Sequence, residues 1–290
     1  GFSASLIFYD SMLSDITDEE RMDYVSSQGY AWGYIGSCVP FVLCLVIVLG
    51  SDPLGIRMET AMGIAFVLVA VWWLLMSLPL LKNYEQKYYV EKKPHAIAQS
   101  FKRLGETFKN MKEEKQVFMF LLAFFFYIDG VYTIIDMATA YGSALGLDST
   151  GLLLALLVTQ IVAFPCAIIF GNLSYRIRTE KLIIVCIFAY LGIAIFAVFL
   201  KTQLQFWILA ILVGMFQGGI QALSRSYFTK IIPEEHSGEY FGLMDICGKG
   251  ASFVGTTIVS IVSQLTGNIS MGVGMIAILF CIGIVIFLKA

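Results

Sequence analysis

Long runs of apolar residues, separated by short polar segments, occupy most of the chain. The runs predict membrane-spanning helices at about 28–49, 58–81, 117–141, 150–172, 181–200, 205–229, 240–264 and 269–288. Each is close to the ~20 residues that cross a bilayer as a helix. Residues 1–16 are also apolar, but as a helix they would reach only about 24 Å, short of a hydrocarbon core of roughly 30 Å. We therefore expect an all-α polytopic membrane protein with about eight full transmembrane helices and a partial one at its N-terminus.

One long polar segment, 82–116, divides the chain into an N-terminal part, 1–81, and a C-terminal part, 117–290. After Pro94 its apolar residues recur at intervals of four and three, which places them on one helical face with lysines opposite. These residues are Ile97, Phe101, Leu104, Phe108 and Met111. The pattern is typical of an amphipathic helix at a membrane surface. A calmodulin-like target helix has the same pattern, but a connector between two helix bundles is the simpler interpretation.

The distribution of basic residues predicts the orientation of the chain. When segment 82–116 is placed in the cytoplasm, alternation of the spans assigns fifteen basic residues to that side and two, Arg57 and Lys201, to the outer side. Cytoplasmic loops carry the excess of lysine and arginine in membrane proteins. We therefore expect segment 82–116 and the C-terminus in the cytoplasm. The fifteen are Arg21, Lys82, Lys87, Lys92, Lys93, Lys102, Arg103, Lys109, Lys112, Lys115, Arg176, Arg178, Lys181, Lys230 and Lys289.

Composition excludes several classes of function. The chain is 58% hydrophobic and 14% charged, with a mean hydropathy of +0.81, unlike a soluble domain. The six cysteines lie inside predicted spans without a Cys-x-x-Cys spacing, and His95 and His236 stand far apart in loops. The sequence has no His-Glu-x-x-His, Gly-x-Ser-x-Gly or phosphate-loop motif. We expect a monomer without a metal site, cofactor, nucleic-acid partner, enzymatic activity or ATP-driven pumping.

Asp129 is a carboxylate inside the predicted span 117–141, about 18 Å along the helix and therefore near the bilayer midplane. Inserting a charged side chain at this depth has a high free-energy cost, and such a residue is by default interpreted as part of a functional site. The neighbouring Gly130 permits close backbone approach. Asp129 therefore suits a proton acceptor or a partner for an amine, and the alternative is a structural carboxylate bonded to a neighbouring helix. Tyr132 and Asp136 extend this candidate site, although Asp136 also fits a solvated vestibule.

The spans 205–229 and 240–264 carry further polar residues. Asp245 and Lys249 are four residues apart and close enough to pair, either as a switchable ion pair or as a permanent one that lowers the cost of insertion. Gln217, Gln221 and Arg225 recur at four-residue steps, so they share one helical face toward a common cavity. The alternative for Arg225 is that its guanidinium reaches out to the membrane interface. Gly214 and Gly218 form a small-xxx-small face for close helix packing.

Two stretches resemble one branch of the major facilitator superfamily, the transporters similar to the autophagy-related vacuolar effluxers. Gly218-Gly219-Ile220-Gln221-Ala222-Leu223-Ser224-Arg225-Ser226 matches a G-G-x-Q-A-L-S-R-S run, followed by Pro233, Tyr240-Phe241-Gly242-Leu243 and Gly248-Lys249. Residues 127–134 match a Y-x-D-G-V-x-T-I signature. The resemblance extends over nearly the whole chain, and its most specific residues lie at 127–136 and 218–250.

A third stretch, between the predicted spans 150–172 and 181–200, resembles the superfamily's cytoplasmic G-x-L-x-D-R-x-G-R loop. It supplies the candidate gate residues Gly171, Arg176 and Arg178. Tyr175 replaces the aspartate of that motif, and Arg178 stands where glycine is usual. A charge-relay gate in this loop is therefore in doubt.

The turn at 17–36 is a weak copy of 232–251, shifted by 215 residues, although two acidic turns can also agree by coincidence. Facilitator-type carriers are built from parallel repeats of six spans. In that register 240–264 is the eleventh span, 28–49 is the fifth and residues 1–16 end the fourth. We therefore expect about three and a half further spans upstream of Gly1.

The resemblance implies a secondary carrier of the facilitator fold that works by alternating access. It implies efflux of a small polar organic solute, with amino acids as the solute suggested by the family name and a proton as the coupling ion. Asp129 is then the coupling or solute-binding carboxylate, with Asp245 and Lys249 as electrostatic counterparts. Short loops favour a prokaryotic cytoplasmic membrane. The rival hypothesis is a membrane sensor or scaffold that keeps the fold without transport.

Overall fold

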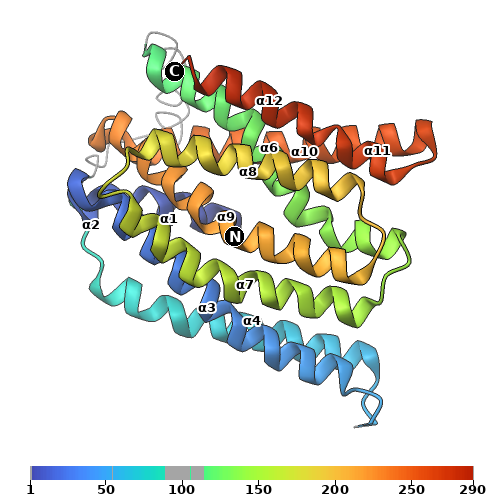
Figure 1. Cartoon of the computed structure of the whole chain (residues 1–290). Coiled ribbons are helices and arrows are strands. Elements are labelled where there is room, and N and C mark those ends of the chain that lie inside the picture. Colours follow the sequence, from blue (N-terminus) through green and yellow to red (C-terminus); the bar gives the residue numbers. More distant parts are fainter. Residues whose placement is uncertain (1, 54, 89–104, 106–113, 290) are drawn as a thin grey trace.

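The computed structural model describes residues 2–53, 55–88, 105 and 114–289, and most of these residues are helical (Figure 1). Eight helices within these residues are long and apolar enough to cross a membrane. This confirms the prediction of an all-helical protein with about eight full transmembrane helices. The amphipathic helix expected after Pro94 lies outside the described residues.

The helices follow the predicted apolar runs. Two short helices, α1 (Phe2–Ser11) and α2 (Leu13–Ile16), precede α3 (Met22–Leu49) and α4 (Met58–Asn83). The part after residue 114 contains α6 (Lys115–Ala144), α7 (Ser149–Leu173), α8 (Thr179–Val198), α9 (Gln203–Ile231), α10 (Ser237–Thr266), α11 (Ile269–Gly274) and α12 (Ile276–Phe287). Two short 3-10 helices, η1 (Glu19–Arg21) and η2 (Glu234–His236), precede α3 and α10.

Local sequence signals set several helix boundaries. The Thr202 side chain accepts a hydrogen bond from the Gln205 backbone N–H while the Gln205 side chain bonds back, a capping box that begins α9. Asp148 caps α7 by accepting from the Gly151 N–H at 2.6 Å. Gly267, with φ of 66°, ends α10 in the left-handed conformation that glycine adopts without a steric penalty.

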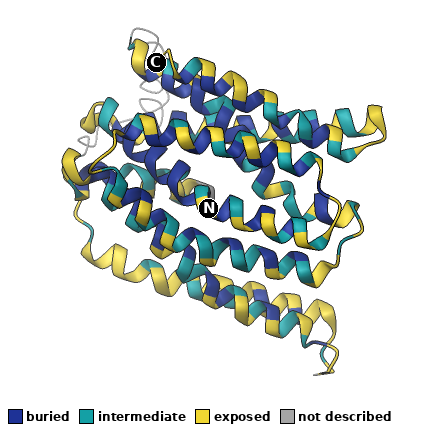
Figure 2. Cartoon of the chain, viewed as in Figure 1, coloured by how far each residue is buried: buried dark blue, intermediate teal, exposed yellow. Residues whose placement is uncertain are grey.

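The spans differ in how deeply they lie in the bundle. In the most apolar windows of α6 and α9, 61% of residues are buried, compared with 6% for α4 (Figure 2). Helix α4 packs on α3 and presents large apolar side chains such as Phe66, Val67 and Leu81 outward. Such a surface suits lipid and would be costly in water. Helices α6 and α9 therefore form the interior of the C-terminal part.

The turn at η1, the residues after α4, the loop 174–178 and the turn at η2 lie together at one end of the molecule, which we call the linker end (Figure 1). The two parts of the chain meet here and along α3, because α3 packs against α7 and α9 while α1 packs against α10. At this end the Asp15 carboxylate also binds the residues that follow α4 through hydrogen bonds. It accepts hydrogen bonds from the Tyr84 hydroxyl and from the backbone N–H groups of Lys87 and Tyr88, the latter two at 3.1 and 3.0 Å.

The two turns that the sequence relates by an offset of 215 residues have the same local structure. Each begins with an extended residue, Asp18 or Pro233, continues through a single 3-10 turn and leads directly into a long helix. The offset that aligns η1 with η2 also aligns the first residues of α3 and α10. The similarity of the two turns therefore holds in the backbone as well as in the sequence.

Candidate functional site

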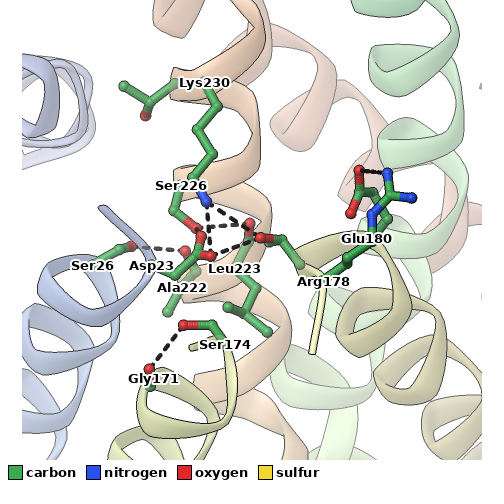
Figure 3. Close-up of polar contacts among 12 residues, drawn as sticks. Asp23, Ser26, Gly171, Ser174, Arg178, Glu180, Ala222, Leu223, Ser226 and Lys230 are labelled. Carbon is green, nitrogen blue, oxygen red and sulfur yellow. Dashed lines mark hydrogen bonds and ion pairs between the residues drawn. The ribbon is translucent and has the colours of Figure 1, made fainter. Parts of the chain in front are cut away.

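A buried polar connection between the two parts of the chain lies at the linker end, centred on Asp23 in the first turn of α3. Its Oδ2 accepts hydrogen bonds from Thr179 Oγ1 at 2.6 Å and from Lys230 Nζ at 2.8 Å, and its Oδ1 accepts one from Ser226 Oγ at 2.6 Å (Figure 3). Asp23 is only 5% exposed. Its position at a helix N-terminus also favours a negative charge. One buried carboxylate thus joins α3 to the start of α8 and the end of α9.

Arg225 makes a second connection close by. Its Nε donates to Ser26 Oγ at 2.9 Å, its Nη2 to the Ser26 carbonyl at 3.2 Å and its Nη1 to Asp10 Oδ1 at 3.1 Å. The guanidinium also lies over the rings of Tyr9 and Tyr30, about 5 Å from each centroid. Arg225 is 4% exposed, so the alternative that it reaches to the membrane interface is wrong. It is instead a buried link to both α1 and α3.

We call these residues together the linker-end network: Asp10, Asp23, Ser26, Thr179, Arg225, Ser226 and Lys230. Arg225 was predicted to be functional, but the other six were not singled out from the sequence. One signal was available, because Asp10 and Arg225 are separated by the same 215 residues that relate the two turns. The two residues occupy equivalent positions in α1 and α9, and they pair with each other.

The predicted polar face of α9 lies along α3. Tyr34 of α3 donates a hydrogen bond to Gln221 Oε1 at 3.2 Å, and it also interacts with the buried Gln217. Together with Arg225, these two glutamines therefore face one helix of the N-terminal part, and the common cavity expected beside them stays a prediction. Gly214 and Gly218 face α7 instead, where an added Cβ would lie 2.6 Å from the Thr159 carbonyl oxygen or 2.7 Å from Ala167 Cβ. The prediction that they allow close helix packing is confirmed.

Asp245 and Lys249 form an ion pair on α10, as their spacing indicated. Their side chains are 23% and 49% exposed, so this pair is much more open than the linker-end network. Asp245 also lies within electrostatic range of Asp10 and of the half-buried Tyr132. Two carboxylates, with a cation on each side of them, therefore follow one another from α9 through α1 to α10. In order they are Arg225, Asp10, Asp245 and Lys249.

Asp129 and Asp136 occupy different surroundings on the same helix. Asp129 is fully buried, and its Oδ1 accepts hydrogen bonds from Thr133 Oγ1 at 3.2 Å and from the Gly255 N–H at 3.0 Å. Asp136 is exposed and accepts a hydrogen bond from Ser252 Oγ at 3.3 Å. Asp129 therefore contacts α10 through a glycine backbone, whereas Asp245 and Lys249 bond to each other.

The three candidate gate residues separate in the structure. Gly171 packs on α3, where an added Cβ would lie 2.7 Å from Ser27 Cβ. Arg178, directly before α8, pairs with Glu180 in the first turn of that helix at 3.0 Å (Figure 3). Both Arg178 and Arg176 are largely exposed. Tyr175, which replaces the aspartate of the family motif, instead packs against Tyr24 of α3, with ring centroids 5.9 Å apart and the rings tilted by 38°. At this loop the described contacts between the two parts are packing contacts rather than ion pairs.

Solved structures with the same arrangement of helices define the class of fold. The chain superposes on the E. coli fucose:proton symporter FucP with a TM-score of 0.67 at 16% identity, covering 97% of this chain and 72% of that one. It superposes on a bacterial homologue of the iron transporter ferroportin, in an outward-facing state, with a TM-score of 0.61 at 16% identity, covering 95% and 65%. The first of these structures belongs to the major facilitator superfamily. The protein is therefore an integral, multi-pass membrane protein with the major facilitator fold.

Sequence comparison gives the family. The model of the Atg22-like vacuole effluxer family matches residues 10–289, and the chain belongs to this family. The chain is 46% identical over 288 residues to the MFS-type transporter YxiO of Bacillus subtilis, covering 99% of this chain and 67% of that protein. It is 25% identical over 303 residues to autophagy-related protein 22 of Botryotinia fuckeliana, covering 93% and 50%. The chain thus spans about half the length of this fungal relative. These relatives agree with the prediction of a transporter rather than an enzyme.

Proposed function

We propose that this chain provides the C-terminal bundle and the end of the N-terminal bundle of a secondary carrier that works by alternating access. The observation that carries the proposal is the linker-end network. Within the part of the chain that the structure describes, both ion pairs between the two parts, Asp10–Arg225 and Asp23–Lys230, lie in this network. Polar contacts at one end of a two-bundle protein can be exchanged for water when the bundles rock apart, unlike a continuous apolar interface.

The state of the structure fits one step of such a cycle. We assign the linker end to the cytoplasm, because the positive-inside bias places segment 82–116 and the C-terminus there. A closed linker end then corresponds to an outward-facing carrier, the state reported for the ferroportin homologue of similar fold. The relative in Bacillus subtilis supports a prokaryotic cytoplasmic membrane. We further propose that the protein acts as a monomer.

We propose efflux as the direction on the basis of the family description, and amino acids as the solute on the basis of the exposed charges on α10. An amino acid carries an ammonium and a carboxylate. Asp245 offers a carboxylate to the solute ammonium, and the more exposed Lys249 offers an ammonium to the solute carboxylate. A solute that replaces each partner of the existing ion pair would keep both charges compensated. Asp129 is the proposed coupling carboxylate.

Proteoliposomes containing the full-length protein test this proposal. A mixture of radiolabelled amino acids should exchange across the membrane, and Lys249→Ala should reduce the exchange at least tenfold because the solute carboxylate loses its partner. Lys181→Ala is the matched control, since Lys181 is exposed at the start of α8 and makes no proposed contact with solute. Exchange that is unchanged in Lys249→Ala would contradict the solute site. An absence of exchange in the unaltered full-length protein would favour the sensor or scaffold.

A further inference from the structure

Helix α6 is held closely between two other helices near its centre. On one side, an added Cβ at Gly130 would lie 2.5 Å from the Phe280 ring of α12, and one at Gly283 of α12 would lie 3.0 Å from Tyr127 Cβ. On the other side, an added Cβ at Gly255 of α10 would collide with the Asp129 carboxylate and the Thr133 hydroxyl. A glycine on each side thus lets α6 approach its neighbour. Asp129 lies in the contact between α6 and α10.

The two carboxylate oxygens of Asp129 differ in their hydrogen-bond partners at this contact. Oδ1 accepts both available hydrogen bonds, from Thr133 Oγ1 and from the Gly255 N–H. Oδ2 is fully buried and has no hydrogen-bond partner among the described residues. A carboxylate oxygen that is removed from water without a partner is costly, and a charged one more so. A proton on Oδ2 removes that charge while leaving both bonds to Oδ1 in place.

The charged groups on the packed helices do not neutralise Asp129. On α6 the nearest acid in sequence, Asp136, is exposed and bonds to Ser252. On α10, Lys249 bonds to Asp245, and Glu239 lies in the first turn of the helix. Helix α12 contains no acidic or basic residue from Ile276 to Phe287, and its Cys281 is exposed. No ion pair of Asp129 occurs in the described part of the chain, so its charge has no cation to balance it.

The shape of the site favours a proton over a metal ion. Asp129 and Thr133 present three side-chain oxygens, whereas hard cations such as Ca²⁺ take six to eight oxygen ligands. The close approach of the Gly255 backbone also leaves no room for a side chain that would add another. A proton needs one oxygen atom, and the unpartnered Oδ2 is that atom.

We propose that Asp129, with Thr133 and the Gly255 N–H, forms a proton-binding site. Asp129 Oδ2 carries the proton while α6 and α10 are in contact. When α10 moves away from α6, water reaches Oδ2 and the O–H bond breaks, so that the proton passes to water and the carboxylate remains on Asp129. No other covalent bond changes in this step, and the hydrogen bond from the Gly255 N–H to Oδ1 is exchanged for one to water. As a coupling device the site rests on the proposed carrier function. The binding of a proton by Asp129 does not depend on the carrier function, so different experiments test the two claims.

Infrared spectroscopy of the purified full-length protein tests the proton directly. A protonated carboxylic acid gives a carbonyl-stretch band that an ionised carboxylate lacks. We expect this band at neutral pH in the unaltered protein and in the control Asp136→Asn, and its complete loss in Asp129→Asn. The Asn side chain is nearly isosteric, and its carbonyl can keep both hydrogen bonds, so this variant should fold. Thr133→Val is a second test, because loss of the Thr133 hydrogen bond should shift the band in frequency.

Three results would overturn the proposal: no band at neutral pH, a band that persists in Asp129→Asn, or a band that Thr133→Val leaves unshifted. Loss of the band when sodium chloride replaces choline chloride would also overturn it and assign the site to a cation. Coupling is measured separately, as the acceleration of amino-acid flux by an imposed pH gradient. This acceleration should vanish in Asp129→Asn and persist in Asp52→Asn, since Asp52 is exposed in the turn between α3 and α4. A band without any flux in the unaltered protein would contradict the carrier function and leave the proton site standing.

Discussion

The linker-end network and the Asp129 site differ in how far hydrogen bonds and opposite charges compensate their buried charges. In the network, Asp23 accepts three hydrogen bonds and balances Lys230, and Arg225 is bonded to Asp10 and to Ser26 of α3. At the second site, Asp129 has two donors to one oxygen, and among the described residues it has no donor to the other oxygen and no cation. The first arrangement stabilises one relative position of the two parts of the chain. The second favours a change in protonation, so the two sites suit different tasks in one cycle.

Among the substitutions that test this comparison, Asp23→Asn should lower the free energy of unfolding most. The substitution leaves Lys230 with a buried charge and without its carboxylate, and losing one partner of such a pair costs about 3 kcal/mol. We expect a fall of that size in the free energy of unfolding of the full-length protein in detergent. Asp18→Asn is the matched control, because Asp18 is an exposed acid in the preceding turn. Equal effects of the two substitutions would mean that Asp23 contributes no more than a surface charge.

Gly255→Ala should have the next largest effect. The new methyl group would collide with the Asp129 carboxylate, and overpacking of this kind costs about 2 kcal/mol. The thermal midpoint should fall and the infrared band assigned to Asp129 should shift. Gly242→Ala on the same helix is the control, since an added Cβ there meets nothing within 4 Å. A Gly255→Ala protein as stable as Gly242→Ala would show that α6 and α10 are less closely packed than described.

The Asp10–Arg225 pair should show a smaller effect, an interaction energy between the two side chains. A double-mutant cycle separates this energy from the other effects of each substitution on stability. A double-mutant cycle with Asp10→Asn and Arg225→Met should give an interaction energy of about 1–2 kcal/mol, since the two side chains are in direct contact. The same cycle on Asp10 and Lys181 supplies the control for distant charges. Strict additivity for Asp10 and Arg225 would remove this pair from the network.

Arg178→Ala should have the smallest effect. Arg178 is largely exposed and pairs with Glu180 in the first turn of α8, and such surface pairs are worth about 0.5 kcal/mol or less. Stability and amino-acid exchange should therefore stay close to those of the unaltered protein. A large loss of exchange would instead restore the gate role that the family motif suggests for this loop.

The sequence predicts the spans well because each one has to satisfy its backbone hydrogen bonds internally and cover its surface with apolar side chains. It also predicts interactions within one helix, such as Asp245 with Lys249 and the shared face of Gln217 and Gln221. The partners of Asp23 were beyond prediction, because Lys230 lies 207 residues away and the crossing of α3 with α9 decides which charges meet. The unequal oxygens of Asp129 likewise depend on Gly255 of another helix.

The 215-residue offset is the one long-range signal that the sequence does contain. It predicts that η1 and η2 share a structure, which they do, and applied to Arg225 it points to Asp10. The two halves of a repeat are related by an axis that runs between them, and equivalent residues that lie close to this axis can meet each other. This inference identifies one partner in the network, but not the contacts of Asp23, whose partners lie at positions unrelated by the offset.

The most direct test of the account is the distance between the two related turns. Spin labels at Glu20 and Glu235, both exposed and equivalent by the offset, would report it in the full-length protein on a background with the native cysteines replaced. If the linker-end network holds the two parts of the carrier together, the unaltered protein should give mainly the short distance, and Asp23→Asn should shift the population to a longer one. A single unchanged distance in both proteins would contradict the account.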